Sequence, residues 1–212
     1  METRPDVQVT SLFDEETVPI EGGDLQWVPL RRRLGIQAFG TNAYRAERAG
    51  DLVVEYHVES PGQEEMYLVV RGGMRFTVGE EELDVPAGST VFVARPELRR
   101  GGIELEADTV VLAVGGWPDR AYHSLPWEPI FLAQEHMRSG NWAKAAETLE
   151  REAGDHLDTG IVRFRLACCY AELGDRERAM QEARKAVEIS PGIRERMAES
   201  EHLRGLPLEE LP

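Results

Sequence analysis

The sequence predicts a multidomain α and β chain, in which an all-β domain precedes an all-α domain. Up to residue 114, short apolar runs alternate with polar residues, which is the pattern of β-strands with one buried face. After residue 129, apolar residues recur at intervals of three and four, which is typical of amphipathic helices. Residues 115–128 contain two glycines and two prolines and follow neither pattern, so we place a linker there.

The predicted organisation has five parts. They are an N-terminal extension (1–26), a β-barrel (27–114), a linker (115–128), a helical domain with a capping helix (129–203) and a C-terminal tail (204–212). The extension is polar and acidic, so we expect a loosely packed arm.

Composition and charge exclude several classes of protein. The 212 residues carry 24 basic and 39 acidic side chains, a formal charge of −15, which repels phosphate backbones and argues against nucleic-acid binding. No apolar run approaches the roughly 20 residues that span a membrane, and the first residues do not resemble a secretory signal. The two cysteines, Cys168 and Cys169, are adjacent and unsuited to a disulfide scaffold. We therefore expect a cytoplasmic protein.

Six runs in the first half read as strands, and turn residues such as Gly72-Gly73 separate them. These runs are 52–59, 66–70, 74–78, 81–85, 89–94 and 108–114. Many short strands at close spacing favour a sandwich or barrel over a fold of alternating strands and helices.

Residues 64–100 resemble a cupin. The cupin pattern has a glutamate, six further residues and a glycine, which are here Glu65 and Gly72. A proline–x–glycine turn between two strands follows, here Pro86-Ala87-Gly88. The resemblance covers about 27–114 and implies an RmlC-like jelly roll, the double-stranded β-helix of that family.

The resemblance also bears on metal binding. A metal-binding cupin supplies a His-x-His pair, the glutamate and a third histidine, and this chain keeps only Glu65, with Arg99 in place of the third histidine. Arginine has no lone pair to donate, so the resemblance implies a metal-poor barrel and no cofactor. An alternative stays open, in which His57, Glu59 and Glu65 hold Fe, Mn, Ni, Cu or Zn.

A metal-free site is equally coherent. Strand alternation places Glu65 and Tyr67 on one face, and the resemblance points Glu65 into the barrel. Arg99 opposite Glu65 would form a charge-assisted pair. That pair could simply fill the interior of the barrel. It could also open to bind a small carboxylate, with Arg99 as the clamp and Tyr67 and His57 as hydrogen-bond donors. In a third alternative the pair serves catalysis.

The second half contains an internal repeat. When the sequence is shifted so that Gly140 falls on Gly174, Asn141 falls on Asp175. Residues 174–191 resemble the second helix of a tetratricopeptide repeat, a helix–turn–helix unit with the same period as this shift. The resemblance covers about 127–203 and implies helical hairpins that bind a protein or peptide.

These observations favour a non-catalytic binding or scaffold protein, in which the barrel senses a small anion or mediates homodimerisation and the helices bind a protein. The alternative is a cupin-class enzyme (an oxygenase, isomerase or decarboxylase) that uses His57, Glu59 and Glu65 with or without a metal. In a third hypothesis the helices carry the function and the barrel is an assembly platform.

Overall fold

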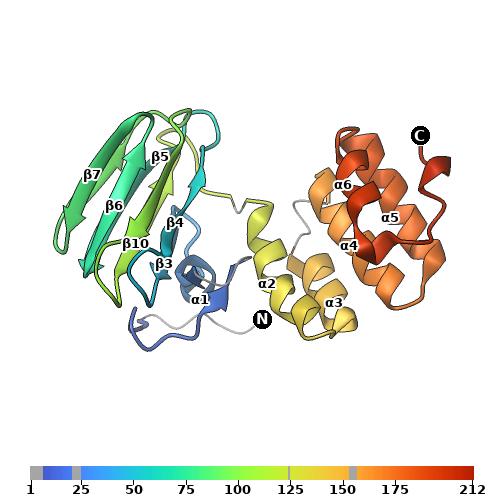
Figure 1. The fold of residues 1–212 in the computed structure, drawn as a ribbon, viewed down its shortest axis with the longest axis horizontal. Helices are drawn as coiled ribbons and strands as arrows, with labels where there is room; N and C mark the ends of the chain where they lie inside the picture. The colour runs from blue at the N-terminus through green and yellow to red at the C-terminus, as the bar shows by residue number, and fades with distance from the viewer. Residues whose placement is uncertain (1–6, 21–24, 124, 153–156) are drawn as a thin grey trace. The chain divides into compact units, whose positions relative to one another are not determined.

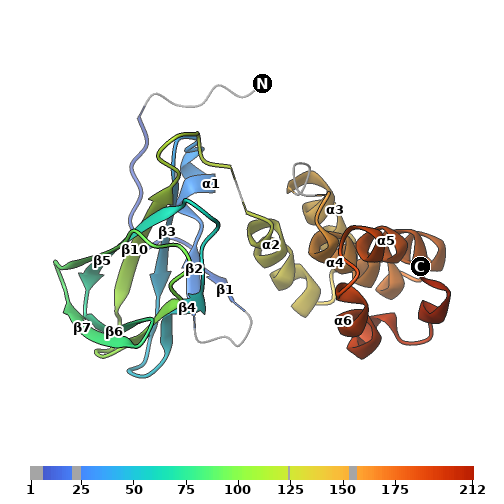
Figure 2. The ribbon, with the colours of Figure 1, turned by 90° about the horizontal axis from the view of Figure 1, so that it is seen from above.

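The computed structural model describes residues 7–20, 25–123, 125–152 and 157–212. The chain divides into two compact units, residues 1–123 and 124–212 (Figure 1). The first unit consists of strands with one short helix, and the second is helical (Figures 1 and 2).

Two antiparallel sheets make up the N-terminal unit. The six-stranded sheet has the order β1 (Val18–Pro19), β2 (Gln26–Val28), β3 (Gly40–Arg45), β10 (Val110–Gly116), β5 (Glu64–Arg71), β8 (Thr90–Val93). The four-stranded sheet has the order β4 (Leu52–His57), β9 (Arg100–Glu104), β6 (Gly73–Val78), β7 (Glu81–Pro86). From β3 onward, the order β3-β10-β5-β8 in one sheet and β4-β9-β6-β7 in the other is that of a jelly roll, so the structure confirms the predicted all-β architecture.

The core of this unit lies between the two sheets. Its buried side chains come from alternate positions of the strands, as the period of two requires. They include Val53, Tyr67, Val69, Phe76, Val85, Val93 and Val111. The rings of Tyr67 and Phe76 pack with their centroids 5.0 Å apart, which joins β5 of one sheet to β6 of the other.

The N-terminal residues correct one expectation. Residues 1–26 are expected to form a loosely packed arm. In the structure, β1 lies within this range and β2 begins at its last residue, and the two strands extend the six-stranded sheet beyond β3. Residues 1–6 and 21–24 lie outside the described part. The reason for the difference is apolar burial, because Val18, Ile20 and Leu25 are all buried. A short helix, α1 (Leu30–Leu34), follows β2.

The C-terminal unit is a series of helices. They are α2 (Trp127–Arg138), α3 (Trp142–Glu152), α4 (Gly160–Glu172), α5 (Arg176–Ile189) and α6 (Ile193–Glu199), followed by the short 3₁₀ turns η2 (Glu201–Leu203) and η3 (Leu208–Glu210). Neighbouring helices pack against one another from α2 to α5, and η2 packs against α4. Across the described residues, no helix is long and apolar enough to cross a membrane.

Positions related by the sequence repeat have the same local structure in two of the connections between helices, α2 to α3 and α4 to α5. Gly140 ends the first helix of one hairpin with φ 71°, and Gly174 ends the first helix of the next with φ 78°. Each is followed by a side chain that caps the next helix: Asn141 Oδ1 accepts a hydrogen bond from Lys144 N (3.3 Å), and Asp175 Oδ1 accepts one from Arg178 N (3.0 Å). The sequence repeat is therefore also a repeat of local structure.

Candidate functional site

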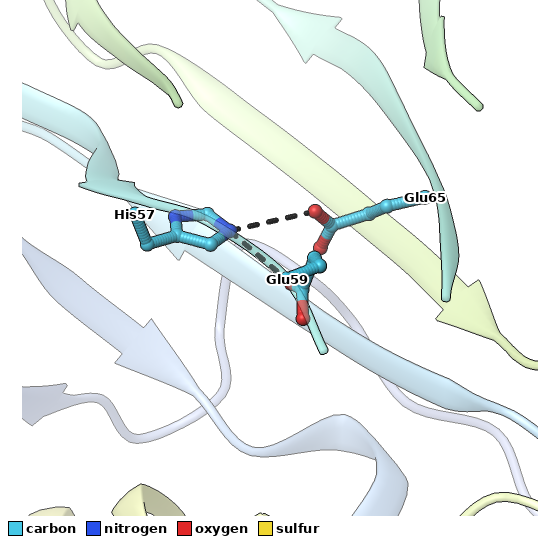
Figure 3. A group of neighbouring side chains, drawn as sticks. All are labelled: His57, Glu59 and Glu65. Carbon is cyan, nitrogen blue, oxygen red and sulfur yellow. Dashed lines mark hydrogen bonds and ion pairs between the residues drawn. The ribbon is translucent and has the colours of Figure 1, made fainter. Parts of the chain in front are cut away.

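Polar and charged side chains from both sheets meet in the interior of the jelly roll. His57 ends β4 and is paired in register with Arg100, the first residue of β9, so the two belong to the four-stranded sheet. Glu65 and Tyr67 lie on β5 of the six-stranded sheet. Glu59 follows β4 and points toward His57 and Glu65 (Figure 3). We call these five residues, His57, Glu59, Glu65, Tyr67 and Arg100, the ion network.

Arg100 is the most deeply buried charge of the ion network, and its side chain is completely inaccessible to solvent. Its Nε donates to Glu65 Oε2 at 3.2 Å and to the Tyr67 hydroxyl at 3.3 Å. Its Nη1 donates to the backbone carbonyls of Pro96 (3.2 Å) and Leu98 (3.0 Å). These four bonds fix the guanidinium plane beside the Glu65 carboxylate.

The structure places Arg100, and not Arg99, beside Glu65, which corrects the predicted interior position of Arg99. Arg99 is exposed, and its guanidinium lies 5.9 Å from the ring centroid of Tyr56. The physical reason is strand alternation, since neighbouring residues at the start of β9 project to opposite faces. The clamp expected of Arg99 is therefore available only from Arg100.

His57 lies between the two carboxylates of the ion network. Its Nε2 is 3.2 Å from Glu59 Oε1 and 3.5 Å from Glu65 Oε2, while Nδ1 is 2.7 Å from the backbone carbonyl of Glu55. Burial alone would lower the pKa of His57, but the hydrogen bonds with Glu59 and Glu65 outweigh burial and raise the pKa to about 10. The imidazole is therefore a cation at neutral pH, and both of its nitrogens donate.

Glu65 and Tyr67 have opposite protonation preferences. Burial would raise the pKa of Glu65, but contacts with His57, Tyr67 and Arg100 hold it below its usual value, so the side chain is a carboxylate. Burial and the neighbouring Glu65 carboxylate raise the pKa of Tyr67 well above its usual value. Tyr67 is thus a neutral phenol that donates its proton to Glu65 Oε2.

The ion network has a donor set that metal ions use, but its present bonding does not suit a cation. One ligand atom each from His57, Glu59 and Glu65 lies within 4.8 Å of the others. However, His57 is protonated, and Arg100 already donates to Glu65. A metal ion at this position would have to displace the His57 proton and lie beside the Arg100 charge, which opposes its binding. The predicted metal-ligand set is therefore assembled in space, and the Arg100 guanidinium lies against one of its carboxylates.

Two further polar residues of the barrel were not among the predicted site residues. Tyr44 on β3 packs against the barrel core, and burial together with the charge of Glu65 raises its pKa well above the usual value. Gln63 is 3% exposed, and its Oε1 makes no hydrogen bond with any described residue. Gln63 comes directly before β5, two residues before Glu65, and this spacing was the available signal, because alternate residues of an extended segment share a face.

Comparison with solved structures finds similarity to several cupins over about half of this chain. It is similar to KdgF from Halomonas sp., with 17% identity over 53% of this chain and 96% of that chain and a TM-score of 0.39. It is similar to a sugar phosphate isomerase of the cupin superfamily from Silicibacter pomeroyi, with 20% identity over 48% of this chain and 66% of that chain and a TM-score of 0.40. An RmlC-like cupin from Shewanella frigidimarina gives 13% identity over 55% and 97% of the two chains and a TM-score of 0.39.

At these identities the likeness transfers no activity to this chain. No protein-family model and no curated protein matches the sequence.

Proposed function

We propose that this chain is a non-catalytic binding protein, in which a metal-free jelly roll binds a small carboxylate and the helical unit binds a protein partner. The single observation that carries the first half is the position of Arg100. It is a fully buried cation that donates to Glu65, the one residue that this chain retains from the metal-ligand pattern of cupins. A guanidinium at this position favours anions over metal ions.

The charges of the ion network support the same proposal. His57 and Arg100 contribute two positive charges, and Glu59 and Glu65 contribute two negative charges. His57 and Arg100 share both carboxylates, so a ligand carboxylate that replaced Glu59 would lie beside two donors, at the 3.2 Å and 3.8 Å that separate Glu59 Oε1 from His57 Nε2 and Arg100 Nη2. His57 gives access to this position, because its side chain is 32% exposed while that of Arg100 is fully buried.

The helical unit supports the second half of the proposal. Gly140 and Gly174 occupy equivalent turns of the sequence repeat, and consecutive helices pack as antiparallel hairpins would. Tetratricopeptide repeats stack in this way and bind peptides or proteins on the surface that the stacked helices form. We assign the helical unit of this chain the same kind of role.

A second candidate function has one observation in its favour. The donor atoms of His57, Glu59 and Glu65 converge within 4.8 Å, and one imidazole with two carboxylates is a non-standard set that a divalent transition metal can use. In that case the metal would be Fe, Mn, Ni, Cu or Zn, and the reaction an oxygenation, isomerisation or decarboxylation. Binding of such an ion requires loss of the His57 proton.

The proposed function is tested by titrating the purified chain with acetate and larger monocarboxylates in the presence of a chelator, followed by calorimetry. Sodium chloride at matched ionic strength serves as the blank, because exposed charges respond to salt alone. We expect saturable binding in the wild type, loss of binding in His57→Gln, and unchanged binding in Arg99→Met. Binding that appears only when a transition metal is added would contradict the metal-free proposal and support the enzyme.

A further inference from the structure

Glu59 is held less tightly in the ion network than Glu65. Glu65 Oε2 accepts bonds from Arg100 Nε at 3.2 Å and from the Tyr67 hydroxyl. Glu59 Oε1 lies 3.2 Å from His57 Nε2 but 3.8 Å from Arg100 Nη2, which is beyond hydrogen-bond distance. Glu65 therefore accepts two hydrogen bonds and has His57 Nε2 3.5 Å away, whereas within the described part of the chain the Glu59 carboxylate has a single hydrogen-bond partner, His57.

Arg100 Nη2 is a buried donor without an acceptor among the described residues. It makes no hydrogen bond there, although the other two guanidinium nitrogens make four. A buried N–H group without an acceptor costs free energy. Because this donor is charged, an acceptor that binds to it gains a stronger hydrogen bond than a neutral donor would give. Glu59 Oε1 lies 3.8 Å from this donor and makes no hydrogen bond with it.

The backbone position of Glu59 lets its side chain leave. Glu59 lies in the connection between β4 and β5, where its backbone N–H donates to the carbonyl of Pro96 at 2.9 Å. Three residues of this connection, Val58, Pro61 and Gly62, are exposed, so water lies close to the segment. The Glu59 side chain itself is 9% exposed, so its carboxylate leaves His57 by a change of side-chain rotamer toward these exposed neighbours while the backbone stays fixed.

The geometry of the donors identifies the ligand class. With Glu59 in place, its Oε1 lies 3.2 Å from His57 Nε2 and 3.8 Å from Arg100 Nη2, and once Glu59 has left, neither nitrogen has a carboxylate at that position. A single carboxylate group has two oxygens, one for each nitrogen, so one monocarboxylate fills the position. A planar carboxylate that spans His57 Nε2 and Arg100 Nη2 would also satisfy the unpaired donor, which Glu59, tethered to its own backbone, does not reach.

We propose that Glu59 is a built-in competitor that occupies the ligand position, and that the ligand is a small monocarboxylate bound between His57 and Arg100 once Glu59 has rotated away. This inference rests on the proposed function, because it specifies the ligand and its regulation at the same site. A tethered group competes at a high effective concentration, which is in the millimolar range for short flexible connections. Glu59 therefore weakens binding, so that only abundant monocarboxylates occupy the site.

The test compares acetate binding in the wild type, Glu59→Gln and Glu64→Gln by calorimetry, with chelator present. Glu64→Gln is the matched control, since Glu64 is an exposed residue of the same segment and its substitution removes the same charge. We expect Glu59→Gln to bind acetate about tenfold more tightly than the wild type. Glu64→Gln should bind as the wild type does.

A second readout keeps the inference testable if Glu59→Gln is unstable. Loss of the Glu59 carboxylate leaves His57 Nε2 and Arg100 Nη2 without their contact to it. Acetate should therefore raise the midpoint of thermal unfolding more in Glu59→Gln than in the wild type. Glu59→Asp shortens the side chain by one methylene and should give an intermediate affinity. Equal or weaker acetate binding by Glu59→Gln would overturn the inference while leaving the proposed function intact. Absence of binding in every variant would overturn both.

Discussion

Arg100 Nε lies 3.2 Å from Glu65 Oε2, and this contact joins the two sheets of the jelly roll through a fully buried cation. Glu65 projects from β5 of the six-stranded sheet and Arg100 from β9 of the four-stranded sheet. A buried pair of this kind is costly to break on one side, because the remaining charge loses its opposite charge and gains little water in return. The pair is thus both a structural tie between the sheets and the electrostatic centre of the candidate site.

The adjacent arginines provide a controlled test of this tie. Arg100→Met leaves Glu65 without its buried cation, and we expect it to lower the free energy of unfolding by about 3–5 kcal/mol. Arg99→Met removes an exposed guanidinium that lies over the face of Tyr56, and its effect should stay below about 1 kcal/mol. Urea unfolding of both variants measures the difference. Similar losses in the two variants would contradict the assignment of Arg100 to the interior.

The elevated pKa of His57 predicts how stability depends on alkaline pH. The pKa is about 10 in the folded chain and about 6.5 in an unfolded one, so the folded state retains the proton more strongly. The stabilisation is complete below about pH 6.5 and is lost as the pH rises through 10. The difference in unfolding free energy between wild type and His57→Gln should therefore shrink from pH 6 to pH 10, as measured by urea unfolding. A constant or widening gap would show that His57 is neutral.

The hydrogen bond from Tyr67 to Glu65 predicts how the free energy of unfolding depends on acidic pH. The Tyr67 hydroxyl helps to hold the pKa of Glu65 below its usual value. Glu65 therefore stabilises the fold at pH values above its pKa in the unfolded chain, and this stabilisation is lost as the pH falls through its lower pKa in the folded chain. Tyr67→Phe removes the bond and should cost about 1–3 kcal/mol at neutral pH. It should also move the onset of acid destabilisation to higher pH. If the free energy of unfolding fell at the same acidic pH in Tyr67→Phe as in the wild type, Tyr67 would have no influence on the pKa of Glu65.

The two cysteines of the helical unit are predicted to be unreactive. Cys168 and Cys169 are buried and unbridged on α4, and burial raises the pKa of Cys168 to about 11 and that of Cys169 to about 12. Because the thiolate is the reactive form, a thiol reagent at pH 8 should label neither residue in the folded chain and both after denaturation. Rapid labelling of the native chain would show that α4 is exposed or opens readily.

Strand alternation explains how much of the jelly roll the sequence predicts. The runs 52–59, 66–70 and 74–78 are recognisable because apolar and polar residues alternate along them, and the structure places β4, β5 and β6 there. The same alternation correctly groups Glu65 with Tyr67 on the inner face of β5.

The strand β9 could not be found in this way, and the misplacement of Arg99 follows from that. β9 begins Arg100-Gly101-Gly102, which has no strand propensity of its own. Close packing requires a glycine at position 101, since a Cβ atom on Gly101 would lie 2.7 Å from the ring of Tyr56. Without a recognised strand, no alternation was available to decide which arginine faces the interior.

The contacts that define the ion network are long-range, so they too lie beyond sequence reasoning. Glu65 and Arg100 are far apart in the sequence, and their approach depends on the way the two sheets face each other. The sequence supplied His57, Glu59, Glu65 and Tyr67 as candidates, but the protonation of His57 depends on distances between them. The distances that bear on metal binding are therefore visible only in the three-dimensional arrangement.

The central claim, that protein cations and a proton occupy the place of a metal, is tested most directly by the metal content of the chain. Tag-free protein purified without added metal or chelator is analysed for Fe, Mn, Ni, Cu and Zn, alongside His57→Ala. We predict far less than one equivalent of any metal in both proteins, and thermal unfolding that a chelator leaves unchanged. Near-stoichiometric metal in the wild type that is lost in His57→Ala would contradict the claim and make His57, Glu59 and Glu65 its ligands.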